Sequence, residues 1–376
     1  MRRLAQVVFN AEGTVGGEQK HVLHLIDGLD RTRFEVEVIT WDIPAFADEL
    51  KARGVPHTSV TAERILDRAL LRRLELLIGE GHYDIVHAHG HRAGLLGRLA
   101  AVRAGSDHVV WTCHLAENKS ERHPIVAWGY RRALGWLDAR TDVTVAVSPY
   151  LREWLIEHGT DSARCVVIPN GVDTTVFHPG ESDPGLLAEL GLEPGSPVVG
   201  CVARLTEQKG VETFLEAAAQ IGARAPGVQF VLVGGGPLDA ELRRLAEDLG
   251  VNVVFAGERG DIPQLLRVFD VAVVPSRWEG AFCFTVLEAM ASGVPVVCSD
   301  IRLFSDVVEP GVQAMLFGVG DAEALTRSVM ALIDAPDVAR AIGQAGRQLV
   351  ADEYTVDRLR ERVSALYEGL VGGEGT

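Results

Sequence analysis

The residues best suited to chemistry in this chain are two cations and two carboxylates that follow apolar, strand-like runs. Arg204 and Lys209 come after one such run, and Glu279 and Glu288 flank the loop that follows another. Arginine offers a planar fork to phosphate oxygens, and lysine offers a mobile point charge. Because the carboxyl ends of parallel strands share one edge of a sheet, phosphorylated ligands bind there. The pattern predicts a site for a nucleotide diphosphate, and hence sugar-nucleotide chemistry.

Backbone amides would complete this site. A loop at residues 281–283 precedes a predicted helix that begins near Phe284. The first amides of a helix lack intrahelical partners and carry the positive end of its dipole, so they stabilise a diphosphate. Glu288 lies one turn into that helix, on the face of Phe284, where a carboxylate can accept hydrogen bonds from two ribose hydroxyls. The candidate contacts are Gly280, Phe282, Cys283, Phe284, Thr285 and Glu288.

Each of these residues also has an ordinary structural explanation. Arg204 and Lys209 are also compatible with solvated cations at a strand end, and Glu288 with an ordinary helix surface. The position of the two cations at a carboxyl strand edge favours the ligand site. Glu279 is either a sugar contact or a solvated loop residue. A glycosidase pair with Glu288 would need both carboxylates to face one glycosidic oxygen, which their spacing does not require. The glycine turn around Gly235 lacks the spacing of a dinucleotide fingerprint.

The first half of the chain carries glycines and histidines in comparable positions. Gly16 and Gly17 precede the first predicted helix, and either let the backbone approach a ligand or form a simple loop. His114 follows a predicted strand at its carboxyl edge. The run of alternating histidines that begins at His87 and includes His89 and His91 has a metal-ligating residue type. Because it has no carboxylate or cysteine partners, we expect no metal there.

The elements that position these residues alternate between short apolar runs and helical patterns, which predicts α/β architecture with parallel, doubly wound sheets. The first helix is expected at Glu18–Leu29 and the last at Val356–Leu370. Predicted strands in the first half are Leu4–Phe9, Glu35–Trp41, Ile85–His87, His108–Thr112, Val143–Ala146 and Val166–Ile168. Those in the second half are Val198–Ala203, Gln229–Val233, Val251–Ala256, Val271–Pro275, Val294–Ser299 and Ala314–Phe317.

A proline- and glycine-rich stretch from Asp173 to Pro197 separates the two halves and predicts a domain boundary. We expect Rossmann-like domains at residues 1–175 and 198–355, joined by a linker at 176–197 and facing a central cleft. Ligand sites prefer such interfaces. The helix at 356–371 would pack on either domain.

Composition excludes several partners. The 376 residues carry a formal net charge of −16, which argues against nucleic acid and against an anionic membrane. Five scattered cysteines without a CxxC pair fit a reducing compartment. The apolar run at the N-terminus is too short for a signal peptide, and no eighteen-residue apolar run follows. We therefore expect a cytoplasmic protein.

Two weaker compositional signals remain. A basic, aromatic segment at Arg122–Arg140 is compatible with a helix on a lipid surface, although packing on the sheet is the favoured interpretation. Arginine strongly outnumbers lysine, of which there are four. This bias suggests a high-GC, actinobacterial source.

Taken together and in order, the motifs resemble the retaining glycosyltransferases of the GT-B fold, family 4, also described as glycosyl transferases group 1. The resemblance covers nearly the whole chain. In the first half it is carried by VGGEQKHVLHLIDGL, DIVHAHG, WTCHL, VAVSPYL and VIPNGVDTTVF. In the second half it is carried by VARLTEQKG, VLVGGGP and VPSRWEGAFCFTVLEAMASGVPVV.

The resemblance implies roles at matching positions. Arg204 and Lys209 would hold the donor diphosphate, and Glu288 the ribose. Gly17, with Gly16 before it, would approach the phosphate from the other domain, and His114 would contact the donor sugar beside the anomeric carbon. The remaining expected contacts are Gly235, the main chain at Glu258–Arg259 beside the base, the amides around Cys283–Thr285, and Glu279 near the sugar.

One departure concerns the two glutamates. The family separates them by seven residues, whereas residues 280 to 287, eight in all, lie between Glu279 and Glu288 here. Gly280 therefore occupies the seven-residue register. Either the loop bulges so that Glu279 still reaches the sugar, or its role is lost.

The implied activity is transfer of a hexose or N-acetylhexosamine from a nucleotide diphosphate sugar, with UDP favoured, to an acceptor hydroxyl. Configuration would be retained, and neither metal nor resident cofactor is expected. The acceptor, whether a small molecule, lipid or glycan, has no readable motif. Two alternatives stay open: a sugar-nucleotide epimerase of the same fold, and a non-catalytic nucleotide-sugar-binding protein.

Overall fold

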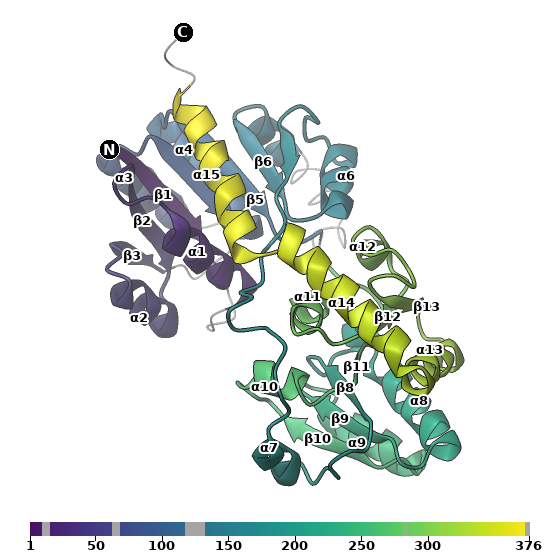
Figure 1. Cartoon of the computed structure of the whole chain (residues 1–376). Coiled ribbons are helices and arrows are strands. Elements are labelled where there is room, and N and C mark those ends of the chain that lie inside the picture. The colour runs from purple at the N-terminus through teal and green to yellow at the C-terminus, as the bar shows by residue number, and fades with distance from the viewer. Residues whose placement is uncertain (10–15, 62–67, 117–131, 281, 283, 373–376) are drawn as a thin grey trace. The chain divides into compact units, whose positions relative to one another are not determined.

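The computed structural model describes residues 1–9, 16–61, 68–116, 132–280, 282 and 284–372 (Figure 1). The chain divides into two compact units, each built on one parallel sheet. Unit 1 comprises Met1–Gly171, Gly280–Phe282 and Val356–Thr376, and unit 2 comprises Val172–Glu279 and Cys283–Thr355. The division thus falls at 171/172, and the C-terminal helix groups with unit 1. All of the stretch expected to be a linker belongs to unit 2, and it contains helix α7 (Pro184–Glu189).

The sheet of unit 1 has seven strands in the order β3-β2-β1-β4-β5-β6-β7. Their order reverses between β1 and β4, which is the kind of position where open α/β sheets bind ligands. At that edge Val8 of β1 is the register partner of His89, which in turn is the partner of Thr112 of β5. The bounds are β1 Arg2–Val8, β2 Phe34–Trp41, β3 His57–Val60, β4 Ile85–His89, β5 His108–Cys113, β6 Val143–Ala146 and β7 Cys165–Val167.

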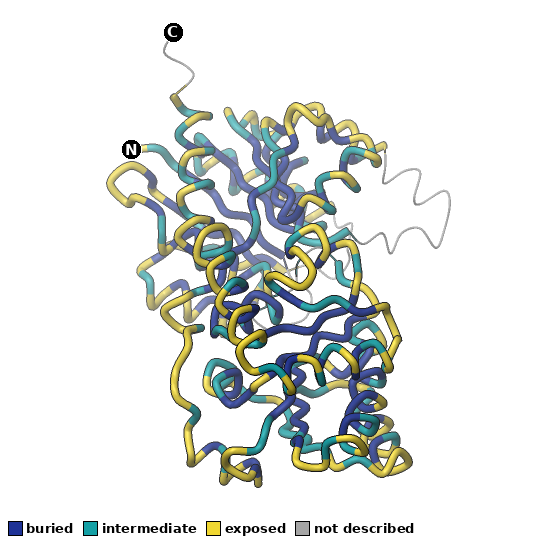
Figure 2. The backbone as a smooth tube through the Cα atoms, turned by 45° about the vertical axis from the view of Figure 1, so that its right-hand side comes forward, coloured by how far each residue is buried: buried dark blue, intermediate teal, exposed yellow. Residues whose placement is uncertain are grey.

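Helices cover both faces of this sheet, because successive strand residues point to opposite sides. Leu4 and Val8 of β1 pack with α1 and α15, whereas Ala5 and Val7 pack with α3 and α4. Figure 1 shows α15 lying along the sheet beside α1, and Figure 2 shows the strands buried beneath their helices. The bounds are α1 Gly17–Gly28, α2 Pro44–Ala52, α3 Arg68–Gly81, α4 Gly90–Ala104, α6 Pro149–Glu157 and α15 Val356–Gly372.

Unit 2 has a six-stranded sheet in the order β10-β9-β8-β11-β12-β13, which reverses between β8 and β11. Its strands are β8 Val198–Val202, β9 Gln229–Val233, β10 Val253–Gly257, β11 Val271–Val274, β12 Val296–Ser299 and β13 Met315–Phe317. Its helices after α7 are η2 Glu207–Lys209, α8 Val211–Arg224, α9 Asp239–Asp248, α10 Ile262–Leu266, α11 Phe284–Ala291, α12 Arg302–Ser305, α13 Ala322–Asp334 and α14 Pro336–Glu353.

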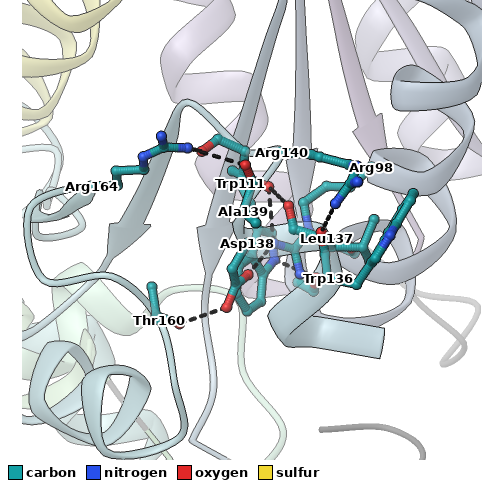
Figure 3. A network of polar contacts seen from close by, with 12 residues as sticks. Arg98, Trp111, Trp136, Leu137, Asp138, Ala139, Arg140, Thr160 and Arg164 are labelled. Atoms are coloured by element: carbon teal, nitrogen blue, oxygen red, sulfur yellow. Dashed lines mark hydrogen bonds and ion pairs between the residues drawn. The ribbon is translucent and has the colours of Figure 1, made fainter. Parts of the chain in front are cut away.

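A buried ion pair lies inside unit 1. The guanidinium of Arg98 on α4 contacts Asp138 at 2.6 Å, and the two side chains are 0% and 8% exposed. Thr160 donates a hydrogen bond to the same carboxylate at 2.9 Å. Arg98 also lies 4.0 Å from the ring centroid of Trp111 on β5, so charge and aromatic surface are buried together (Figure 3).

Among the described residues, no helix combines the length and apolar character needed to cross a bilayer. Part of the segment Arg122–Arg140, considered above for a lipid surface, lies outside the described residues. Within its described part, Trp136 is 45% exposed. Arg140 packs over the indole ring of Trp136 at 4.0 Å from the ring centroid.

Candidate functional site

In unit 2 the predicted cation and carboxylate meet at the carboxyl edge of the sheet. Lys209, at the end of η2 after β8, places its Nζ atom 2.5 Å from Oε1 of Glu279, which follows β11. Ser276 donates to the same oxygen at 2.6 Å, and Gln208 donates to Oε2 at 3.2 Å. The Glu279 side chain is only 4% exposed. The longer spacing to Glu288 therefore does not move Glu279 away from the predicted cation; instead the carboxylate holds the ammonium in place.

Arg204 is more exposed than this pair, and Glu288 is half-buried like Lys209. Arg204 lies two residues after β8 and is exposed, so its guanidinium is accessible to a ligand at the same edge. Glu288 is half-buried on α11, the helix that begins at Phe284 and includes the half-buried Thr285. Cys283 lies outside the described residues, and Gly280 and Phe282 group with unit 1.

Glycines let the loops after β8 and β9 pack backbone against backbone. A Cβ atom at Gly234 would lie 1.9 Å from the carbonyl oxygen of Ala203. The amide of Leu205 donates to the carbonyl of Gly235 at 2.8 Å. A Cβ atom at Gly235 would lie 2.6 Å from the side chain of Glu258, after β10. The glycine turn thus brings three strand ends together, whereas the sequence showed only a strand-to-helix turn there; the contact between Gly235 and the nucleotide stays a prediction.

Gly210 closes the loop that carries Lys209 and allows a specific stability test. Its φ is +57°, and an added Cβ atom would lie 2.3 Å from the carbonyl oxygen of Pro275. Gly191 has φ +67° with nothing within 4 Å. We expect Gly191→Ala to lower the free energy of unfolding by about 1–2 kcal/mol, since only the left-handed backbone is strained. Gly210→Ala should remove a further ~1–3 kcal/mol through the clash.

Urea denaturation of the two glycine variants measures this difference. Both positions lie in unit 2, so the matched substitution at Gly191 controls for the backbone term. Equal losses at Gly191 and Gly210 would contradict the close approach to Pro275.

The guanidinium of Arg259 is held by local carboxylates. It contacts Asp261 through two hydrogen bonds of 2.8 and 2.6 Å and also pairs with Glu189 of α7. The hydrogen bonds from Arg259 keep the pKa of Asp261 below its usual value. The side chain of Arg259 is therefore occupied by these carboxylates. The contact with the donor base that the resemblance implies at this position involves the main chain, and it stays a prediction.

In unit 1 the edge between β1, β4 and β5 carries a cluster of histidines. Gly16 precedes α1, its amide donating to Oε1 of Gln19 at 3.1 Å, and Gly17 is the first residue of that helix. His114 follows β5 directly, and its ring centroid lies 4.7 Å from that of His21 and 5.8 Å from that of His89. Sequence reasoning missed His21. Its signal was a polar residue four positions before Leu25, on the apolar stripe of the first helix.

The three alternating histidines do not act as one group. His87 is bonded to the hydroxyls of Tyr367 and Thr112 at 2.6 and 2.7 Å, and His91 lies 2.8 Å from the carbonyl of Leu115. Of the three, only His89 places a ring nitrogen within 4.8 Å of those of His21 and His114, although the ring of His87 packs against that of His89 with centroids 4.1 Å apart. Burial lowers the pKa of His21 to about 3 and lowers those of His87, His89 and His114 well below the usual value. The four imidazoles are therefore neutral at pH 7.

Comparisons with known proteins agree with this architecture. Residues 15–176 match the family model Glycosyltransferase Family 4, and residues 186–349 match Glycosyl transferases group 1. A galactosyltransferase of Escherichia coli, which by its name uses UDP-Gal, is 28% identical over 95% of each chain. A GDP-mannose-dependent phosphatidylinositol monomannoside mannosyltransferase of Mycolicibacterium smegmatis is 32% identical over 95% of each chain.

Solved structures share the fold. The crystal structure of Anabaena HepE in complex with UDP has a TM-score of 0.84 at 24% identity, covering 98% of this chain and 100% of that one. A glycosyltransferase from Rickettsia africae has a TM-score of 0.87 at 19% identity over 98% of each chain. Two parallel-sheet units with these neighbours define the GT-B fold. The two family models, which together match most of the chain, and the 32% identity to the mannosyltransferase show that this chain is a glycosyltransferase of family 4.

Proposed function

We propose that the protein transfers a hexosyl or N-acetylhexosaminyl group from a UDP-sugar to an acceptor hydroxyl with retention of configuration. The observation that carries the proposal is the Lys209–Glu279 pair at the carboxyl edge of β8 and β11, with Arg204 exposed in the loop that follows β8. A lysine held in this way is a fixed charge at the edge where such sheets bind phosphorylated ligands.

In the proposed reaction the bond between the anomeric carbon and the diphosphate oxygen breaks, and the leaving oxygen takes the electron pair. The acceptor oxygen forms its bond to the same face of that carbon, and its proton passes to the leaving phosphate oxygen. Lys209 and Arg204 stabilise the negative charge that develops on the diphosphate. Glu279 positions Lys209, and Glu288 binds the ribose. The cations neutralise the diphosphate, so donor binding needs neither a metal ion nor a resident cofactor.

Two of the similar proteins support UDP as the donor nucleotide, and one points to GDP. The Escherichia coli relative is named for UDP-Gal, and HepE was crystallised with UDP and with UDP-glucose. The mannosyltransferase relative is named for GDP-mannose. The base is therefore the property that an experiment must decide first.

Thermal unfolding with UDP, GDP, ADP and their common sugars, each in the presence of EDTA, tests the donor assignment. A ligand that binds only the folded state raises the unfolding midpoint with concentration, by RT ln(1 + [L]/Kd) in free energy. We expect UDP to raise the midpoint and GDP and ADP to leave it near that of the free protein. Stabilisation by GDP alone would show that the donor base is guanine rather than uracil. A UDP-induced rise of the midpoint that disappears in EDTA would show that donor binding needs a metal ion.

A second arm tests the reaction itself. The stabilising sugar nucleotide is incubated with the protein, and the products are separated by chromatography. Release of UDP together with a free or transferred sugar supports transfer. Isomerisation of the sugar nucleotide without UDP release would instead identify an epimerase.

A further inference from the structure

One cation at the carboxyl edge of the unit 1 sheet lacks the carboxylate partner that the other arginines of its helix have. Arg92 belongs to the first turn of α4, which follows β4 directly at the point where the strand order reverses. Further along α4, Arg98 pairs with Asp138 and Arg103 pairs with Glu75. Within the part of the chain that the structure describes, the guanidinium of Arg92 forms no ion pair and no hydrogen bond.

Two aromatic rings hold this guanidinium at the edge. The Cζ atom of Arg92 lies 5.2 Å from the ring centroid of Trp41, the last residue of β2. The indole meets the ring of Phe9, directly after β1, edge to face with centroids 5.3 Å apart. Phe9 is buried, and Trp41 and Arg92 are half-buried. Because β1 lies between β2 and β4, Arg92 reaches across the ends of three strands.

A half-buried guanidinium without an anion has lost part of its hydration with no compensating partner, which costs free energy. The cation–π contact with Trp41 restricts the group but leaves its N–H donors available. These donors form a planar fork that matches two oxygens of a phosphate or a carboxylate. The start of α4 is not itself open to an anion, because a Cβ atom at Gly90 would clash with the carboxylate of Glu18. The binding position is therefore the guanidinium of Arg92.

We propose that Arg92 binds a phosphate group carried by the glycosyl acceptor, so that the acceptor is a phosphorylated polyol, sugar or lipid headgroup. The acceptor role rests on the proposed function, whereas anion binding at Arg92 does not. A phosphate carries more charge than a carboxylate at pH 7 and offers three acceptor oxygens. The chain as a whole has a net charge of −16, so a local cation must supply the attraction.

This cation is separate from those assigned to the donor. Arg92 lies in unit 1, whereas Arg204 and Lys209 lie in unit 2. The acceptor phosphate and the donor diphosphate therefore have different partners, and their binding can be measured independently.

The test measures binding of glycerol 3-phosphate to the full chain by calorimetry, with UDP at saturation so that the donor site is filled. Glycerol is the matched neutral probe, and we expect it to bind much more weakly. Arg92→Ala should weaken binding of glycerol 3-phosphate by about 10–100-fold, as loss of a hydrogen-bonded charge does. Arg92→Lys keeps the charge but loses the fork, so its affinity should lie between the two. Arg103→Ala, on the same helix, should bind as the parent does.

Vesicles distinguish a lipid headgroup from a free phosphate. Phosphatidylglycerol in phosphatidylcholine vesicles presents a glycerol phosphate on a lipid, and vesicles of phosphatidylcholine alone are the control. Co-sedimentation that requires both phosphatidylglycerol and Arg92 would assign the phosphate to a lipid. Arg92-dependent binding of glycerol 3-phosphate without co-sedimentation would assign it to a soluble acceptor. Either result supports the proposal.

Circular dichroism and the urea midpoint show whether each variant is folded, and Arg92→Lys serves if Arg92→Ala does not fold. Equal binding of glycerol 3-phosphate by Arg92→Ala and Arg103→Ala would overturn the proposal. Equal affinity of the parent for glycerol and glycerol 3-phosphate would do the same, as would failure of the parent to bind both glycerol 3-phosphate and phosphatidylglycerol vesicles. Failure of UDP to raise the unfolding midpoint would overturn the donor assignment instead, and the comparison of the two arginine variants would still locate the anion.

Discussion

Replacing Lys209 with alanine is expected to lower the rate of glycosyl transfer by about 100- to 1,000-fold, as removal of one preorganised charge-stabilising group does in other enzymes. The Nζ atom lies 2.5 Å from Glu279 at the edge of unit 2, and the lysine side chain is 17% exposed. The variant removes the charge that meets the leaving diphosphate. It also leaves Glu279 without its cation, so the measurement must separate turnover from folding.

The assay follows UDP release from the donor identified by thermal unfolding, with water as acceptor, so that the natural acceptor is not needed. Lys51→Ala is the control, because Lys51 is exposed and its ion pair with Asp48 spans 3.2 Å on the surface. Glu279→Gln should retain part of the activity, since Lys209 keeps its charge but loses an anionic anchor. Equal turnover of Lys209→Ala and the parent would refute the assigned role.

Replacing Arg98 with alanine is expected to lower the free energy of unfolding by about 3–5 kcal/mol, because the carboxylate of Asp138 is then left buried without its cation. Arg98 is fully buried, contacts Asp138 at 2.6 Å and packs on Trp111 (Figure 3). The loss of packing against the indole adds to the loss of the charge.

Arg103→Ala on the same helix is the matched control. Arg103 pairs with Glu75 at 2.8 Å, but its side chain is 52% exposed, so its loss should change stability by about 0–1 kcal/mol. Denaturant unfolding followed by tryptophan fluorescence reports mainly on unit 1, because five of the six tryptophans lie in it and only Trp278 lies in unit 2. Similar midpoints for the Arg98 and Arg103 variants would show that the buried pair does not stabilise the unit. The double variant Arg98→Met, Asp138→Leu should recover much of the loss, since no charge is then left buried alone.

Much of the fold was predictable because buried parallel strands are continuous apolar runs. Gln229–Val233 and Val143–Ala146 were predicted with the bounds that the structure has. The strand β3, His57–Val60, was missed because it is short, lies at the sheet edge and carries three polar residues out of four. Nothing in its local pattern distinguishes it from a loop; it becomes a strand through pairing with β2.

Local spacing in the sequence predicted the strand-end positions of the site residues but not the contacts between them. Lys209 and Glu279 each follow an apolar run, which indicates a strand end, but their contact depends on β8 and β11 being neighbours in the sheet. The pairing of His21 with Asn170 spans 149 positions in the sequence. From the sequence alone, an arginine in a helix such as Arg98 would be assigned to the surface. Its ion pair with Asp138 forms only when the chain folds. Such contacts are tertiary, and periodicity carries no information about them.

Unit 1 is assembled from both ends of the sequence, and this affects the order in which the protein can form during translation. Tyr367 of α15 is fully buried and bonds with Gln6 of β1 and with His87 of β4. Ribosomes deliver domains N-terminal first, yet residues 1–171 must wait for residues 356–372 before their apolar face is covered. Unit 2, although encoded later, is complete by Thr355. The unit that is synthesised second is thus the first whose chain is complete, whereas the earlier unit lacks part of its apolar cover until α15 has been synthesised.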